Sequence, residues 1–152
     1  MPSVDRRLIF DLGMHLGLDT QYYLQKGFRV VALEAVPWMI EHVKRSLTEY
    51  IVAQQLIIVE RALWSVDNEE IPFYVNNDKH DWSSAFKSWA EKDGHHAQEI
   101  SVKTTTLAPL LDQYGIPHYI KCDIEGADEL FVRQLMADQR VDQSVSRISP
   151  RD

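Results

Sequence analysis

The stretch RLIFDLGMHLGLDT, residues 7–20, decides the expected fold. Its apolar run, residues 8–10, ends at an acid, Asp11. Gly13 and Gly17 follow, and the sequence then becomes helix-like. This order is typical of a buried parallel strand, a tight turn and a helix whose first turn faces a ligand. Glycine permits a positive φ at such a turn and lets a ligand approach the backbone closely.

A second apolar run, residues 29–33, predicts another buried strand and ends at Glu34. This acid lies about 20 residues beyond Gly13, where nucleotide-binding folds carry a carboxylate that binds the ribose. The turn alone is a weak signal, because its spacing is not the Gly-x-Gly-x-x-Gly of dinucleotide enzymes. That departure also disfavours a nicotinamide-dependent oxidoreductase. The turn and the acid together favour a cofactor that contains a nucleoside.

The length and charge narrow the class of protein. A chain of 152 residues is expected to form a single domain, residues 1–152. No apolar run approaches the ~20 residues that span a bilayer, and no signal-peptide core is seen, so we expect a cytoplasmic protein without a membrane partner. The net charge of −7, without a Lys/Arg run, argues against a nucleic-acid partner. It is compatible with a cationic ligand such as a sulfonium.

Strand-like and helix-like segments alternate along the rest of the chain. This alternation predicts an α/β fold with a mostly parallel sheet and helices on both faces. Ligands of such sheets bind beyond the carboxyl ends of the strands, so the strand-end segments are expected to share one edge. The remaining strands are expected at 7–10, 56–59, 70–75, 100–105 and 118–122, the helices at 15–26, 37–51, 107–114 and 127–137, and the strand ends at 11–17, 34, 60–62 and 123–126.

The middle of the chain, residues 76–98, is polar and carries Trp82, Ser83, Ser84, Phe86 and Trp89. Such a segment is either a binding loop that covers a site or a surface excursion, and the sequence does not separate the two. The histidines in this segment have no supporting carboxylate spacing, so we interpret them as solvated and predict no metal site. They are His80, His95 and His96.

Six short segments occur in a recognisable order along nearly the whole chain. They are residues 11–20 (DLGMHLGLDT), 34–37 (EAVP), 62–63 (AL), 83–84 (SS), 106–107 (TL) and 120–128 (IKCDIEGAD). Together they resemble the FkbM family of S-adenosylmethionine-dependent methyltransferases, and the last segment is the most specific. The resemblance implies a Rossmann-like class I methyltransferase fold, S-adenosylmethionine as cofactor and a small-molecule acceptor.

The resemblance also implies roles for particular residues. The methionine end of the cofactor is expected near the first turn, and Glu34 is expected to bind both ribose hydroxyls. Glu60, Arg61 or Ala62 is expected to border the adenine, and an exposed salt bridge is the other interpretation of Glu60 and Arg61. The complete expected cofactor set is Asp11, Gly13, His15, Gly17, Thr20, Glu34, Ala62 and Asp123.

The expected reaction is O-methylation of a hydroxylated sugar or natural product. Lys121, Asp123 and Glu125 are the expected catalytic residues, as acceptors of the hydroxyl proton. Lys121 is otherwise a strand residue whose amine reaches solvent. Asp123 and Glu125 follow the expected strand at 118–122, and their side chains are expected on opposite sides of the chain.

Three departures from the family pattern stand out. His15 replaces the usual asparagine, and Ala35 alters the Glu-Pro motif. The family fold continues with further strands after the helix at 127–137, whereas residues 138–152 are polar, so we expect the fold to lack its C-terminal strands and the tail to be disordered or truncated. A second hypothesis therefore remains beside that of an active enzyme: a truncated, inactive domain that binds a ligand or pairs with another chain. A homo-oligomer also remains possible.

Overall fold

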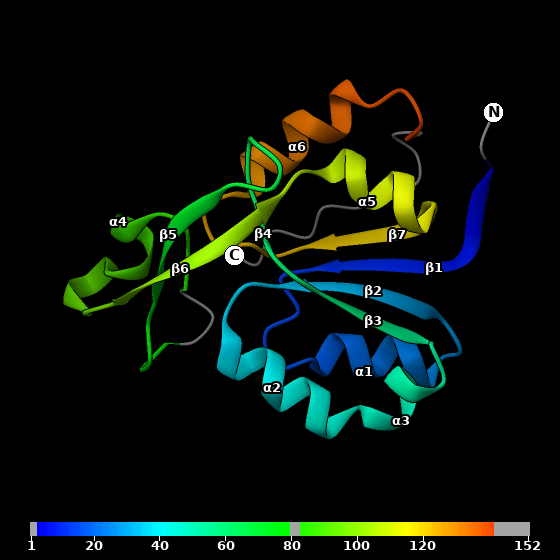
Figure 1. Ribbon diagram of the computed structural model, residues 1–152, viewed down its shortest axis with the longest axis horizontal. Coiled ribbons are helices and arrows are strands. Elements are labelled where there is room, and N and C mark those ends of the chain that lie inside the picture. Colours follow the sequence, from blue (N-terminus) through cyan, green and yellow to red (C-terminus); the bar gives the residue numbers. More distant parts are fainter. Residues whose placement is uncertain (1–2, 80–82, 142–152) are drawn as a thin grey trace.

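The computed structural model describes residues 3–79 and 83–141, and the described part is a layered α/β structure (Figure 1). Its strands are β1 (Val4–Leu12), β2 (Arg29–Glu34), β3 (Leu56–Glu60), β4 (Ala62–Leu63), β5 (Glu70–Val75), β6 (Gln98–Thr105) and β7 (Ile116–Cys122). Its helices are α1 (Leu18–Gln25), α2 (Pro37–Ser46), α3 (Thr48–Val52), α4 (Lys87–Ala90), the short 3-10 helix η2 (Lys92–Gly94), α5 (Leu107–Tyr114) and α6 (Asp128–Ala137). None of these described helices is both long and apolar enough to cross a membrane.

The main sheet has four strands in the order β3-β2-β1-β7, and every neighbouring pair is parallel. Helices α1, α2 and α3 cover one face, and α5 and α6 cover the other (Figure 1). Alternate residues of β1 serve the two faces: Phe10 packs in the cluster that holds Leu107 and Phe131, while Ile9 packs with Val43. Burial on both faces explains why the strands read as continuous apolar runs. The predicted Rossmann-like, mostly parallel fold is confirmed.

A second, smaller sheet has the order β4-β6-β5, with β4 parallel and β5 antiparallel to β6. The sequence predicts the extended segments of β5 and β6, but neither the short strand β4 nor the pairing of the three into a separate sheet. A third apolar cluster joins this sheet to the segment after β2, since Phe73 and Val75 of β5 pack with Val36 and Met39. The small sheet therefore stands beside the carboxyl ends of the main strands.

Two predicted helix boundaries are wrong for a backbone reason. The helix expected from residue 15 begins at Leu18, because His15 (φ 51°) and Gly17 (φ 79°) are left-handed and cannot continue a right-handed helix. The helix expected over 37–51 is divided into α2 and α3 at Leu47, whose φ of −121° lies outside the helical region.

The polar tail predicted at 138–152 is described only as far as Val141, which is buried in the core cluster that also holds Phe131. The expected lack of C-terminal strands concerns residues 142–152, which lie outside the described residues. His80 and Trp82 lie outside them as well.

Candidate functional site

A cavity lies beyond the carboxyl ends of β1, β2 and β7, between the main sheet and the small one. It encloses about 450 Å³, including space open to solvent. Its polar lining comes from strand ends and from the middle segment, and its apolar lining comes from β2, α2, β4 and β5. The polar residues are His15, Glu34, Arg61, Ser83 and Asp123.

The turn after β1 is wedged between the turns after β2 and β7. Gly13 and Met14 donate their N–H groups to the Leu33 carbonyl at 2.9 and 3.1 Å, and Asp123 donates to the Leu12 carbonyl at 2.9 Å. Gly13 has a φ of +85°, and a Cβ on it would lie 2.0 Å from the Asp123 carbonyl oxygen. Only glycine fits here without displacing the backbone at residue 123.

Glu34 is buried at the end of β2, with 6% of its surface exposed, and it lines the cavity. Its Oε1 accepts the backbone N–H of His15 at 3.0 Å, and its Oε2 accepts those of Ala35 at 2.8 Å and Val36 at 3.0 Å. A carboxylate has about four acceptor positions, so these contacts leave one, on Oε1. Glu34 can therefore accept a further hydroxyl as it stands, and its expected role toward both ribose hydroxyls stays a prediction.

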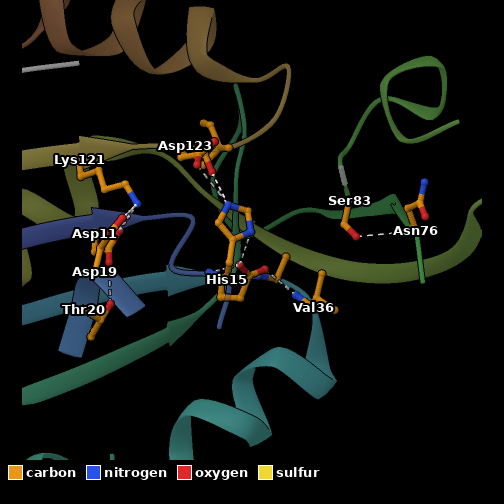
Figure 2. Close-up of polar contacts among 12 residues, drawn as sticks. Asp11, His15, Asp19, Thr20, Val36, Asn76, Ser83, Lys121 and Asp123 are labelled. Carbon is orange, nitrogen blue, oxygen red and sulfur yellow. Dashed lines mark hydrogen bonds and ion pairs between the residues drawn. The ribbon is translucent and has the colours of Figure 1, made fainter. Parts of the chain in front are cut away.

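His15 joins the ends of β2 and β7, and its ring points toward Asp123 (Figure 2). Nε2 lies 3.2 Å from the Asp123 carbonyl oxygen and 3.6 Å from its Oδ2, and Nδ1 lies 3.9 Å from Oε1 of Glu34. Burial opposes the charged imidazolium, but the hydrogen bond to Asp123 and the charge of Glu34 outweigh it and raise the pKa of His15.

The prediction that Asp123 and Glu125 point to opposite sides is wrong. Side chains two positions apart in a strand share a face, so strand alternation gives no reason for opposite sides. Here the strand already ends at Cys122, and Glu125 has a left-handed φ of 43°. The ligating atoms of His15, Asp123 and Glu125 all lie within 4.8 Å of one another.

Burial opposes ionisation of both acids in this cluster. In Glu125 the hydrogen bond with Asp123 acts in the same direction as burial and raises the pKa. In Asp123 the hydrogen bonds with His15 and Glu125 outweigh burial and lower the pKa. Asp123 is therefore the charged member of the pair, and Glu125 holds a proton more readily than an ordinary glutamate.

Asp11 lies behind the cavity wall rather than on it. Its carboxylate is fully buried, accepts the Thr20 hydroxyl at 2.6 Å through Oδ2, and has Oδ1 4.0 Å from the Lys121 Nζ (Figure 2). Lys121 also forms an ion pair with Asp19. Asp11, Thr20, Lys121 and Gly17 are absent from the cavity lining, so their geometry favours a structural role. Their expected roles toward cofactor and acceptor stay predictions.

The described part of the middle segment packs against the turn after β7. The Ser84 hydroxyl donates to the Glu125 carbonyl, and Trp89 Nε1 donates to Glu125 Oε2 at 2.7 Å. A Cβ on Gly126 would meet the rings of Phe86 and Trp89 at 3.3 Å. Between the two interpretations of this segment, these contacts favour a loop that covers the site.

The strand-end geometry agrees with a comparison against protein families. The model described as the methyltransferase FkbM domain matches residues 11–147, which is most of the chain and includes every expected site residue. The chain belongs to the FkbM methyltransferase family. The resemblance stated from the motifs is thereby confirmed. A comparison with curated proteins finds no match.

Within this FkbM-family protein, the cavity gathers only some of the expected cofactor residues: Gly13, His15, Glu34, Ala62 and Asp123. Sequence reasoning missed its apolar walls, to which Met39 and Phe73 contribute. In the sequence these two residues belong to ordinary apolar patterns, so no local signal distinguishes a cavity wall from the core. Glu125 is also absent from the cavity lining, although its carboxylate lies within 4.8 Å of His15 and Asp123. Its contact with Trp89 is not visible in the sequence.

The pair formed by Lys121 and Asp11 gives a prediction about stability. Burial raises the pKa of Asp11 from 3.8 to about 6, although Lys121 and Thr20 lower it. Because the folded-state pKa is raised, this acid favours the fold most when protonated, and its contribution is lost as the pH rises through about 6. Lys121→Met removes a cation that lowers this pKa, so the variant is expected to lose about 3 kcal/mol at pH 8 and clearly less at pH 5.

Urea unfolding of both proteins at the two pH values measures this difference. Lys44→Met is the matched control, because Lys44 pairs with Glu41 and Glu60 at the surface and is expected to cost less than about 1 kcal/mol. An equal loss for Lys121→Met at pH 5 and pH 8 would show that Asp11 does not titrate as described.

Proposed function

We propose that this FkbM-family protein transfers a methyl group from S-adenosylmethionine to a hydroxyl oxygen of a small acceptor, such as a sugar or natural product. The observation that carries the proposal is the meeting of Glu34, His15 and Asp123, from three different strand ends, on one cavity. Membership of a methyltransferase family supports the type of reaction.

The cavity lining suits the parts of this cofactor. Glu34 keeps one acceptor position for a ribose hydroxyl. Leu33, Met39 and Ala62 offer apolar surface for a planar base. The carboxylate of Asp123, whose pKa is lowered, offers negative charge to a sulfonium or an ammonium group.

Methyl transfer requires that the acceptor oxygen, the methyl carbon and the sulfur lie in line, and that a group accept the proton of the acceptor hydroxyl. When bound, S-adenosylmethionine would supply a methyl group on a sulfonium. The C–O bond to the acceptor would form as the S–C bond breaks, with the electron pair of that bond left on sulfur. The rigid corner formed by Gly13 and Asp123 fixes the cavity wall, which serves alignment. Glu125, with its raised pKa, is the better matched acceptor for the hydroxyl proton, while Asp123 keeps its charge.

Calorimetric titration with S-adenosylhomocysteine, the demethylated product, tests the cofactor assignment without knowledge of the acceptor. We expect saturable binding of one molecule per chain and no binding of NADH under the same conditions. A folded sample that binds neither compound would contradict the proposal and favour an inactive relative. Binding of NADH alone would favour an oxidoreductase.

A further inference from the structure

We infer that His15, Asp123 and Glu125 form a site for one divalent transition-metal ion at the edge of the cavity. One imidazole nitrogen and one oxygen from each of two carboxyl groups lie within 4.8 Å of one another. They come from two turns that are far apart in the sequence, after β1 and after β7. The sequence shows no metal spacing because the cluster exists only in the folded chain.

The separations suit a shared ion after a small closure of the side chains. Nitrogen and oxygen ligands lie about 2.0–2.2 Å from such an ion, so two ligands of one ion are at most about 4.4 Å apart. Two carboxyl groups at this distance repel when both are charged, and a cation between them removes that cost. His15 and Asp123 line the cavity, which would leave the remaining positions of the ion open to a ligand.

Groups behind the cluster hold its members in place. Nδ1 of His15 faces Oε1 of Glu34 at 3.9 Å while Nε2 faces Asp123. Trp89 holds the Glu125 carboxylate at 2.7 Å, and Ser84 holds the Glu125 carbonyl. A ligating histidine whose second nitrogen faces a carboxylate, and a ligating carboxylate that is itself hydrogen-bonded, are usual features of metal sites.

The donor set indicates the class of ion. Imidazole with two carboxylates suits Mn²⁺, Fe²⁺ or Zn²⁺ better than Ca²⁺ or Mg²⁺, which prefer oxygen ligands alone. Three protein ligands leave up to three positions of an octahedral ion. Two neighbouring oxygens of one acceptor would fill two of them.

The metal site also narrows the chemical class of the acceptor. This part of the inference rests on the proposed function. It points to a molecule with adjacent oxygens, either a vicinal diol or a hydroxyl beside a carbonyl. The ion would lower the pKa of the bound hydroxyl. With the ion bound, Asp123 and Glu125 serve as ligands, so Glu125 no longer takes the hydroxyl proton as it would in the metal-free site, and that proton leaves to water.

Titration of the protein with Mn²⁺ alone, followed by electron paramagnetic resonance, tests the site. We expect one saturable Mn²⁺ per chain, with nitrogen coupling from an imidazole in the wild-type spectrum. Glu125→Gln is expected to weaken binding at least about tenfold. Asp78→Asn is the matched control, because Asp78 faces His95 at 3.8 Å in a surface pair outside the cluster, and its binding should be unchanged.

Absence of saturable binding, absence of nitrogen coupling in the wild type, or equal binding by a folded Glu125→Gln variant would overturn the inference. The wild-type spectrum decides the matter even if that variant does not fold. Because this titration contains no cofactor, Mn²⁺ binding without S-adenosylhomocysteine binding would refute the proposed function and keep the metal site. The reverse result would refute the metal site alone.

Discussion

Gly13→Ala is expected to lower the free energy of unfolding by about 4 kcal/mol, the upper range for a single substitution. The new Cβ would lie 2.0 Å from the carbonyl oxygen and 2.8 Å from the carbonyl carbon of Asp123, so two backbone turns would have to separate. The left-handed φ of +85° adds a cost of about 1–2 kcal/mol for a residue with a Cβ. Urea unfolding measures the change.

Gly27→Ala is the matched control for this prediction. Gly27 has a similar φ of +91°, but a Cβ on it would meet nothing within 4 Å. We expect only the conformational cost, about 1–2 kcal/mol. Equal losses in the two variants would mean that the contact between Gly13 and Asp123 does not constrain the fold.

Glu34→Ala is expected to weaken binding of S-adenosylhomocysteine by about 100-fold or more. A hydrogen bond to a charged group contributes about 1.5–3 kcal/mol, and the cavity wall also loses the carboxylate that bonds its backbone N–H groups. The same change leaves the N–H groups of His15, Ala35 and Val36 without their acceptor, so stability should fall by about 3 kcal/mol. Glu34→Gln keeps one acceptor oxygen and should lie between the wild type and Glu34→Ala in both respects.

Calorimetry and urea unfolding measure these two effects separately. Glu41→Ala is the control, since Glu41 is exposed on α2 and its ion pair with Lys44 contributes less than about 1 kcal/mol. Its binding should equal that of the wild type. Wild-type affinity in a folded Glu34→Ala variant would remove Glu34 from the cofactor site.

The fold was predictable where a local pattern decides the structure. Segments 70–75 and 107–114 have the predicted bounds, because alternation and helical spacing are visible within each segment. The pairing of β5 with β6 was not predictable, because a segment of more than 20 residues that contains α4 and η2 separates the strands, and nothing local fixes their partner. The left-handed φ of Glu125 was not predictable either, and its side chain bonds Trp89, which is 36 residues away in the sequence.

The candidate site shows the same division. Gly13, Glu34 and Asp123 meet because parallel strands bring their carboxyl ends to one edge, a rule that the sequence alone can apply. The position of Asp11 behind the wall was not visible, because sequence does not show which face of β1 meets Thr20. Contacts such as that of His15 with Asp123, 108 residues apart, exist only after folding.

The most direct test of the account is a crystal structure of the protein with S-adenosylhomocysteine bound. We expect a ribose hydroxyl on the carboxylate of Glu34, with the sulfur end of the ligand beside His15 and Asp123. Density for the ligand elsewhere on the molecule, or a ribose that does not contact Glu34, would contradict it.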